Sequence, residues 1–113
     1  MTTDDEKRTI RDDFHEAVNM TPKELERWLD TDESKAVGQK PADGGESVGH
    51  ESGRRIIEIL GTKQADLTDD DYAHMKKVTG YVHRHSSQRP DGDVTETKWR
   101  YSLMNWGNDP VKE

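Results

Sequence analysis

A shortage of large aliphatic side chains is the feature that most restricts how this chain can fold. Leu, Ile, Val and Phe together supply 17 of the 113 residues, about 15%, which is below the roughly 20% at which a chain becomes prone to disorder. The formal net charge of −7 is modest for this length and does not prevent collapse. We therefore expect one small core, completed by the three Trp and three Tyr, because aromatic rings bury large apolar areas.

Length and composition exclude several classes of protein. A chain of 113 residues has the length of one ordinary domain, and the absence of Cys excludes disulfides, thiolate nucleophiles and Cys-based zinc sites. No apolar run reaches the roughly 18 residues of a membrane span, and Met1–Glu6 lacks the apolar core of a secretory signal. We expect a cytoplasmic protein without membrane contacts, with a flexible N-terminus over residues 1–4 and a single helical domain over residues 5–113.

Hydrophobic periodicity and capping signals predict helices and no strand. A helix is expected over Asp5–Asn19, a second from Pro22 to about Asp32 or Ser34, and an apolar third one around Ile56–Leu60. Capping boxes predict a fourth helix after Thr68 and a last one after Asp93, which Gly107 ends. The glycine-rich stretch 38–49 is expected to be a mobile loop between the second and third helices. These elements predict a small all-α bundle of about five helices.

One apolar stripe of the last predicted helix contains two tryptophans. Trp99, Leu103 and Trp106 lie within about 60° of one another on a helix. Exposed tryptophans can stack on nucleic-acid bases. In a chain with so few aliphatic residues, we expect this stripe to form core instead.

Positive charge is concentrated in the second half of the chain. Residues 1–50 carry 7 basic and 13 acidic side chains, whereas residues 51–113 carry 10 and 11. An anionic partner should therefore contact the second half, and the alternative is that these residues form ordinary solvated helix faces. The basic candidates for such a contact are Arg54, Arg55, Lys76, Lys77, Arg84 and Arg89.

The segment Gly49–Arg55 is the most suggestive local pattern. It lies where the glycine-rich stretch is expected to enter the third helix, and a helix start with free N–H groups suits a phosphate oxygen. Ser52 would add a hydroxyl, Gly53 would allow close approach, and Arg54 and Arg55 would add charge. The alternative is an ordinary Ser-capped helix with two surface arginines.

Catalytic and metal-binding patterns are not evident. His83 and His85 point about 200° apart on a helix, and the paired faces of His74 and His85 are too far apart along it. Asp69–Asp71 fits helix capping better than a calcium loop, and no orienting acid accompanies Ser52 and His50. We therefore expect a protein that is not an enzyme and has no cofactor and no metal site.

Three stretches resemble a bacterial family of short proteins known as domain of unknown function 3140: Gly53–Leu60, Asp70–His85 and Trp99–Gly107. The resemblance extends from about Arg8 to Lys112. It implies a protein without an established activity, although some relatives carry a DNA-binding label. In the family's pattern a His follows the Trp-Gly pair, whereas Asn108 stands here, so a chemical role of that His would be absent from this member.

Two functions follow from these observations. The first is DNA association through phosphate contacts from Ser52, Gly53 and the basic residues of the second half. The second is a protein-interaction module or homodimer with no nucleic-acid role. If the tryptophan stripe is buried within one chain, its face is not available to a partner.

Overall fold

A computed structural model describes residues 3–37 and 48–112 of the chain. Within these ranges it contains six α-helices, one 3₁₀ turn (η1) and no strand, which confirms the predicted all-α class with one helix more than expected. The elements in chain order are α1 (Asp4–Ala17), α2 (Pro22–Leu29), α3 (Asp32–Ala36), α4 (Val48–Leu60), η1 (Gln64–Asp66), α5 (Asp69–Ser86) and α6 (Lys98–Asn105).

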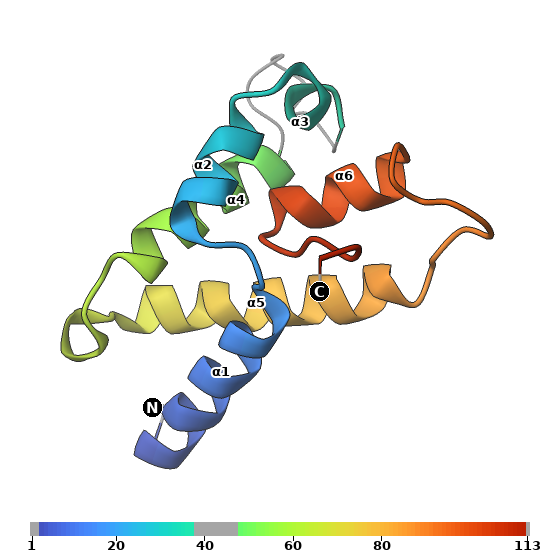
Figure 1. The fold of residues 1–113 in the computed structure, drawn as a ribbon. Coiled ribbons are helices and arrows are strands. Elements are labelled where there is room, and N and C mark those ends of the chain that lie inside the picture. The colour runs from blue at the N-terminus through green and yellow to red at the C-terminus, as the bar shows by residue number, and fades with distance from the viewer. Residues whose placement is uncertain (1–2, 38–47, 113) are drawn as a thin grey trace.

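The longest helix, α5, runs across the molecule in Figure 1, below α2, α4 and α6. Helix α1 crosses it on one side, and α2, α4 and α6 lie on the other (Figure 1). A single cluster of buried side chains joins both sides, and its fully buried members include Phe14, Leu25, Ile56, Met75 and Leu103. A small number of aliphatic residues is therefore enough to form one core, because every helix except the short α3 contributes at least one side chain to it.

Helix ends follow local side-chain chemistry at several predicted positions. Thr21 and Thr68 each accept a hydrogen bond from a first-turn N–H while Glu24 and Asp71 bond back, so both capping boxes are confirmed. Gly107 has a φ of +82° and ends α6 as predicted, because its left-handed backbone lets the next N–H groups bond carbonyls of the last helical turn.

Several helix boundaries differ from the prediction, and local hydrogen bonds explain two of them. The last helix begins at Lys98 with Thr97 as its cap, not at Asp93, because the Asp93 carboxylate instead accepts bonds from the N–H and hydroxyl of Thr95 at 2.9 and 2.6 Å. The second helix ends at Leu29, and extended Thr31 caps the separate helix α3 by accepting the Ser34 N–H at 3.2 Å.

The chain termini and the glycine-rich stretch are described only in part. Thr3 caps α1 and Asp4 is its first residue, although both fall in the range expected to be flexible. Residues 1–2 and 38–47 lie outside the described residues, and Val48 and Gly49, expected at the end of the loop, belong to α4.

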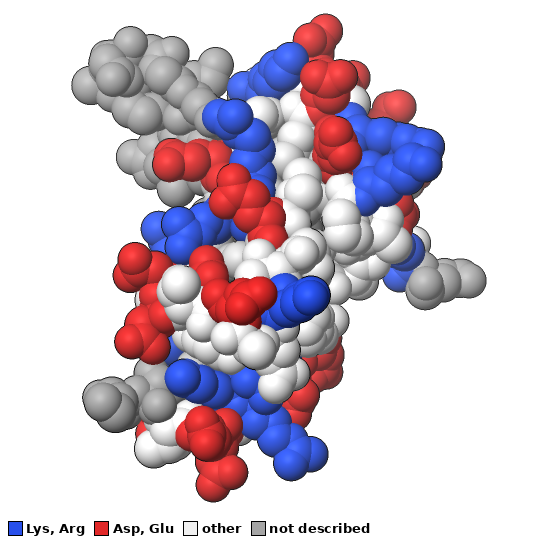
Figure 2. Space-filling model, turned by 90° about the vertical axis from the view of Figure 1, so that its left-hand side faces the viewer, with Lys and Arg blue, Asp and Glu red and all other residues white. Residues whose placement is uncertain are grey.

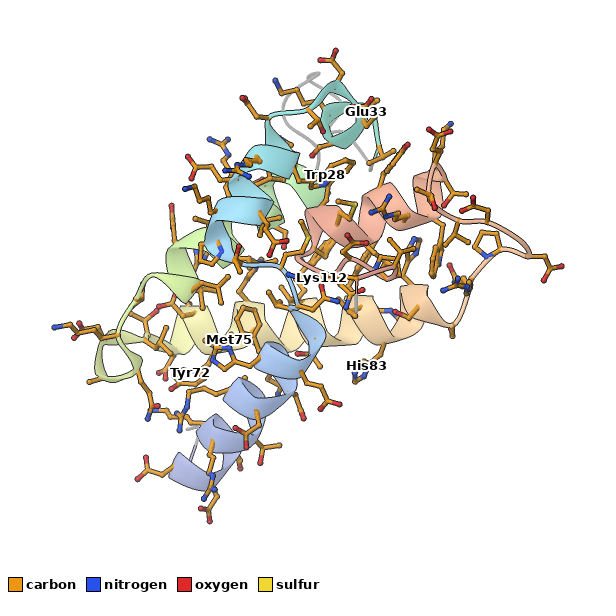
Figure 3. The ribbon with its side chains drawn as sticks, in the orientation of Figure 1. Trp28, Glu33, Tyr72, Met75, His83 and Lys112 are labelled. Atoms are coloured by element: carbon orange, nitrogen blue, oxygen red, sulfur yellow. The ribbon has the colours of Figure 1, made fainter. Side chains whose placement is uncertain are left out.

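The tryptophan stripe lies in the core, as predicted. Trp99, Leu103 and Trp106 are 8%, 0% and 5% exposed, and Trp106 stacks on Tyr81 of α5 with ring centroids 4.2 Å apart. Two half-buried residues, Trp28 and Tyr101, form a second aromatic pair between α2 and α6, where Trp28 is labelled in Figure 3. The aromatic face of α6 is thus filled by this chain's own side chains.

Candidate anion-binding cleft between two helices

The start of α4 overturns one detail of the sequence interpretation. Helix α4 begins at Val48, so Ser52 and Gly53 lie inside it, where backbone N–H groups bond carbonyls four residues earlier. The predicted phosphate site on free N–H groups of a helix start at Ser52 and Gly53 is therefore wrong. The alternative interpretation of Ser52 as a helix cap is wrong for the same reason.

The two glycines of α4 let this helix lie close to α6. A Cβ on Gly53 would lie 2.6 Å from the backbone oxygen of Asn105, and a Cβ on Gly49 would lie 3.1 Å from Nε1 of Trp106. The two positions are four residues apart and so share one face of the helix. Gly53 thus allows a close approach, as predicted, but the approaching group is this chain's own backbone.

Ser52 faces α5 rather than solvent. Ser52 is 3% exposed, and its Oγ lies 2.9 Å from Nε2 of His74, within hydrogen-bond distance. The His74 ring in turn stacks on Trp106 with an interplanar angle of 11°. The aromatic core therefore fixes the imidazole, and the imidazole fixes the serine hydroxyl.

An open cleft of about 380 Å³ lies over this pair, between α4 and α5. Helix α4 supplies five of its lining residues and α5 supplies two: Glu51, Ser52, Arg54, Arg55, Glu58, His74 and Lys77. The structure thus brings together four of the predicted site residues, namely Ser52, Arg54, Arg55 and Lys77. Three cations and two carboxylates line the cleft, and the carboxylate of Asp71 pairs with Arg55 beside it.

Arg55 is held in place by a carboxylate of α5. Its Nη2 lies 3.1 Å from Oδ1 of Asp71, whose other oxygen accepts the Thr68 N–H. The backbone hydrogen bond from Thr68, with the nearby Arg55, holds the pKa of Asp71 below its usual value. The ionised Asp71 therefore positions Arg55 at the edge of the cleft.

The surroundings of His74 favour its uncharged form. Burial is the main reason why the pKa of His74 lies below its usual value, and the positive charges of Arg55 and Lys77 lower it further. A hydrogen bond with the backbone of Ser52 and the nearby Asp71 act in the opposite direction. The pKa of His74 thus depends on the charges of Arg55 and Lys77.

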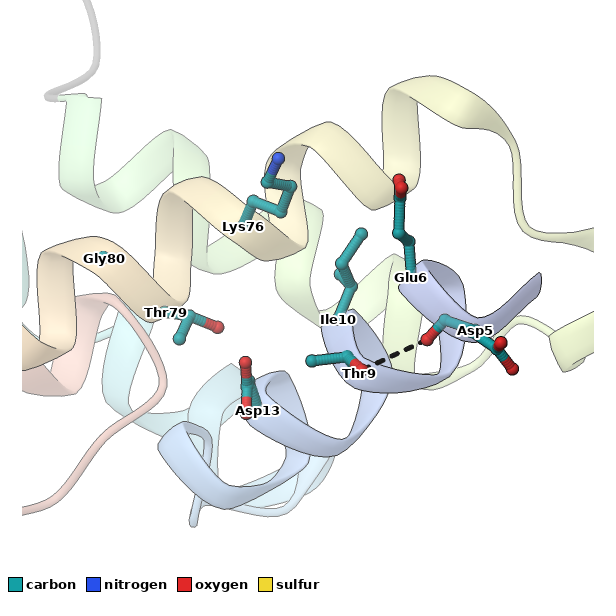
Figure 4. A pocket seen from close by; sticks show the side chains of 8 residues that line it. All are labelled: Asp5, Glu6, Thr9, Ile10, Asp13, Lys76, Thr79 and Gly80. Carbon is teal, nitrogen blue, oxygen red and sulfur yellow. Dashed lines mark hydrogen bonds between the residues drawn. The ribbon is translucent and has the colours of Figure 1, made fainter. Parts of the chain in front are cut away.

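Lys76 does not share the cleft with Lys77, because consecutive residues of a helix point about 100° apart. It lies over a separate open groove of about 590 Å³ between α1 and α5, shown in Figure 4. The carboxylates of Asp5, Glu6 and Asp13 line that groove. Lys76 therefore lies in acidic surroundings that disfavour a phosphate.

Arg84 and Arg89 do not line the cleft either. Arg84 is exposed about two turns beyond Lys77 on α5, and the guanidinium carbon of Arg89 lies 5.5 Å from the ring centroid of Trp99. Figure 2 shows basic and acidic side chains interspersed over one face of the molecule. Basic side chains thus do not form one continuous surface on that face.

His74 is the site residue that sequence reasoning missed. Its spacing in the sequence suggests only a pairing with His85. Its contact with Ser52, 22 residues earlier, depends on how α4 packs against α5. Among the described residues, no group of three or more His, Asp or Glu is placed to hold a metal ion, and no described helix is long and apolar enough to cross a membrane.

Asn108, where the family pattern has a His, takes part in packing. Its Nδ2 donates to the carbonyl oxygen of Ala17 at 2.6 Å. This bond ties the end of α6 to the last residue of α1. The side chain does not line the cleft.

Comparisons with known proteins give one match. The family model described as "Protein of unknown function (DUF3140)" matches residues 13–104, a range that includes every residue of the cleft. No curated protein and no solved structure matches the chain.

Proposed function

The chain belongs to the DUF3140 family, whose function is unknown, and we propose that it binds phosphate groups of DNA without catalysing a reaction. The binding site is the cleft between α4 and α5. The observation that carries this proposal is the convergence of Arg54, Arg55 and Lys77 from two helices on one cleft. Arg and Lys side chains supply many of the phosphate contacts in protein–DNA complexes.

The arrangement of the cleft supports binding better than catalysis. Asp71 already orients Arg55, which lowers the entropy that binding would cost. Ser52 is 3% exposed and lies inside α4, so the backbone N–H groups around it are committed to the helix and do not form an oxyanion hole. A serine nucleophile would lack electrostatic stabilisation here.

The number of cations sets the expected salt dependence. Three phosphate contacts, from Arg54, Arg55 and Lys77, give a slope of about −2.7 in log affinity against log salt concentration. The affinity should then fall about 40-fold between roughly 50 and 200 mM salt. The overall charge of −7 opposes attraction at long range, so we expect weak binding without base specificity.

Fluorescence anisotropy with mixed-sequence duplex DNA tests the proposal. Lys77→Glu and Lys76→Glu make the same charge change at adjacent positions, but only Lys77 lines the cleft. We expect Lys77→Glu to weaken binding about tenfold and to reduce the salt slope by about 1, and Lys76→Glu to have a small effect. Equal weakening by both variants would refute the cleft as the site. An absence of saturable binding at the lower salt concentration would refute DNA association.

The alternative function, a protein-interaction module or homodimer, has less support. Its main candidate surface was the tryptophan stripe, and Trp99 and Trp106 are buried within one chain. A protein partner would have to contact a different face.

A further inference from the structure

The hydrogen bond between Ser52 and His74 has a consequence for any ligand of the cleft. A serine hydroxyl has a single hydrogen to donate. When the neutral imidazole accepts at Nε2, the hydroxyl of Ser52 gives that hydrogen to His74 across the 2.9 Å contact. When the imidazole is protonated, Nε2 becomes the donor, and the hydrogen of Ser52 is released to point at an anion.

The charges that face His74 favour its protonation once an anion is present. From α5 these are Asp71 and Lys77, and the end of α6 presents the uncharged ring of Trp106. The charged residues that line the cleft from α4 are Glu51, Arg54, Arg55 and Glu58. Arg55 and Lys77 are the charges that oppose a proton on the imidazole, and an anion bound between them would offset their effect.

We propose that the cleft binds an oxyanion together with one proton, with His74 as the site of that proton and Ser52 as the donor it releases. This inference rests on the proposed function, because it concerns the same cleft and the same class of ligand. The protonated imidazole adds a fourth positive charge to those of Arg54, Arg55 and Lys77. Where the neutral imidazole accepts at Nε2, Ser52 adds a hydrogen bond that the neutral state lacks.

The linkage between proton and anion fixes how affinity depends on pH. Because each ligand strengthens the other by the same factor, the bound anion raises the pKa of His74. The affinity is lowest above the pKa of the bound state, rises as pH falls through it, and levels off below the lower pKa of the free state. Its total gain is about tenfold for each unit by which the anion raises that pKa.

Nuclear magnetic resonance with sulfate as the probe tests this proposal on the unmodified protein. Sulfate keeps its charge throughout the range of about pH 5 to 8 in which histidines titrate, so any linked proton belongs to the protein. The pKa of His74 is measured from its ring signals with and without sulfate. His83 is the internal control, because it is exposed on the same helix and points away from the rest of the molecule in Figure 3.

We expect sulfate to raise the pKa of His74 and to leave that of His83 unchanged. Equal shifts at both residues would indicate general screening and overturn the proposal. If sulfate or DNA changes the signals of cleft residues without shifting the pKa of His74, the proton linkage alone is wrong and the proposed function stands. If neither ligand perturbs the cleft, both proposals are wrong.

Two variants separate the roles of the pair. His74→Gln cannot titrate, so its affinity for duplex DNA should not rise between about pH 8 and pH 5.5 as that of the unmodified protein does. Ser52→Ala retains the imidazole and should retain the pKa shift with sulfate, but it should bind more weakly at low pH. A pKa shift in Ser52→Ala without any loss of affinity would refute the role of the released hydroxyl.

Discussion

Replacing Gly53 with Ala tests how closely α4 packs against the end of α6. The new Cβ would lie 2.6 Å from the backbone oxygen of Asn105 and 2.7 Å from Cδ2 of Leu29. The side chain of Leu29 can shift a little, whereas Asn105 is anchored, because its side-chain amide bonds residues of both α2 and α3. Overpacking against backbone should cost about 3 kcal/mol, and the better helix propensity of Ala offsets about 1 kcal/mol of it. The free energy of unfolding should fall by about 2 kcal/mol, which lowers Tm by roughly 8 °C.

Gly80→Ala is the matched control, because it makes the same change inside another helix. A Cβ at Gly80 meets only Nη1 of Arg84, at 4.0 Å, so this variant should gain up to about 1 kcal/mol. Urea unfolding followed by tryptophan fluorescence measures both free energies. A Gly53→Ala variant as stable as the unmodified protein would refute the close approach of α4 to α6.

Two further predictions concern single polar residues. Oδ1 of Asn105 accepts hydrogen bonds from Nε1 of Trp28 and Oγ of Ser34. Asn105→Ala would leave these two donors without an acceptor, so the free energy of unfolding in urea should fall by about 2–3 kcal/mol. A loss below about 1 kcal/mol would contradict this network. The hydrogen bond from Lys112 is the main reason why the pKa of Glu24 falls to about 2 from 4.5. Ionised Glu24 therefore stabilises the fold above pH 4.5, and this contribution is lost as pH falls toward 2. Glu24→Gln should therefore lose less stability across that window than the unmodified protein, and identical acid-denaturation curves would exclude a role for this pair.

Local chemistry explains which helix ends could be predicted from sequence. The boxes at Thr21 and Thr68 involve only neighbouring residues, so they form wherever the chain continues into a helix. Asp93 and Thr97 both suit a helix start, and their sequence does not show that Asp93 bonds Thr95 instead. The choice between two good caps was settled by a turn just before α6.

The start of α4 could not be predicted, because glycine is common both in loops and where two helices pack closely. Gly49 and Gly53 are typical of a loop in sequence, and here they form a smooth helix face that contacts Asn105 and Trp106. Only the position of α6 shows which of the two applies. The same tertiary packing brings Ser52 to His74, so the basic residues of the cleft were predicted while its imidazole was not.

The cleft between α4 and α5 is the proposed binding site for phosphate groups. The most direct test is to titrate uniformly labelled protein with short duplex DNA and follow the backbone amide signals by nuclear magnetic resonance. Binding in the cleft should produce the largest shifts at Arg54, Arg55 and Lys77, with small shifts at Lys76. Shifts concentrated at Arg84 and Arg89, or an absence of shifts at low salt, would contradict it.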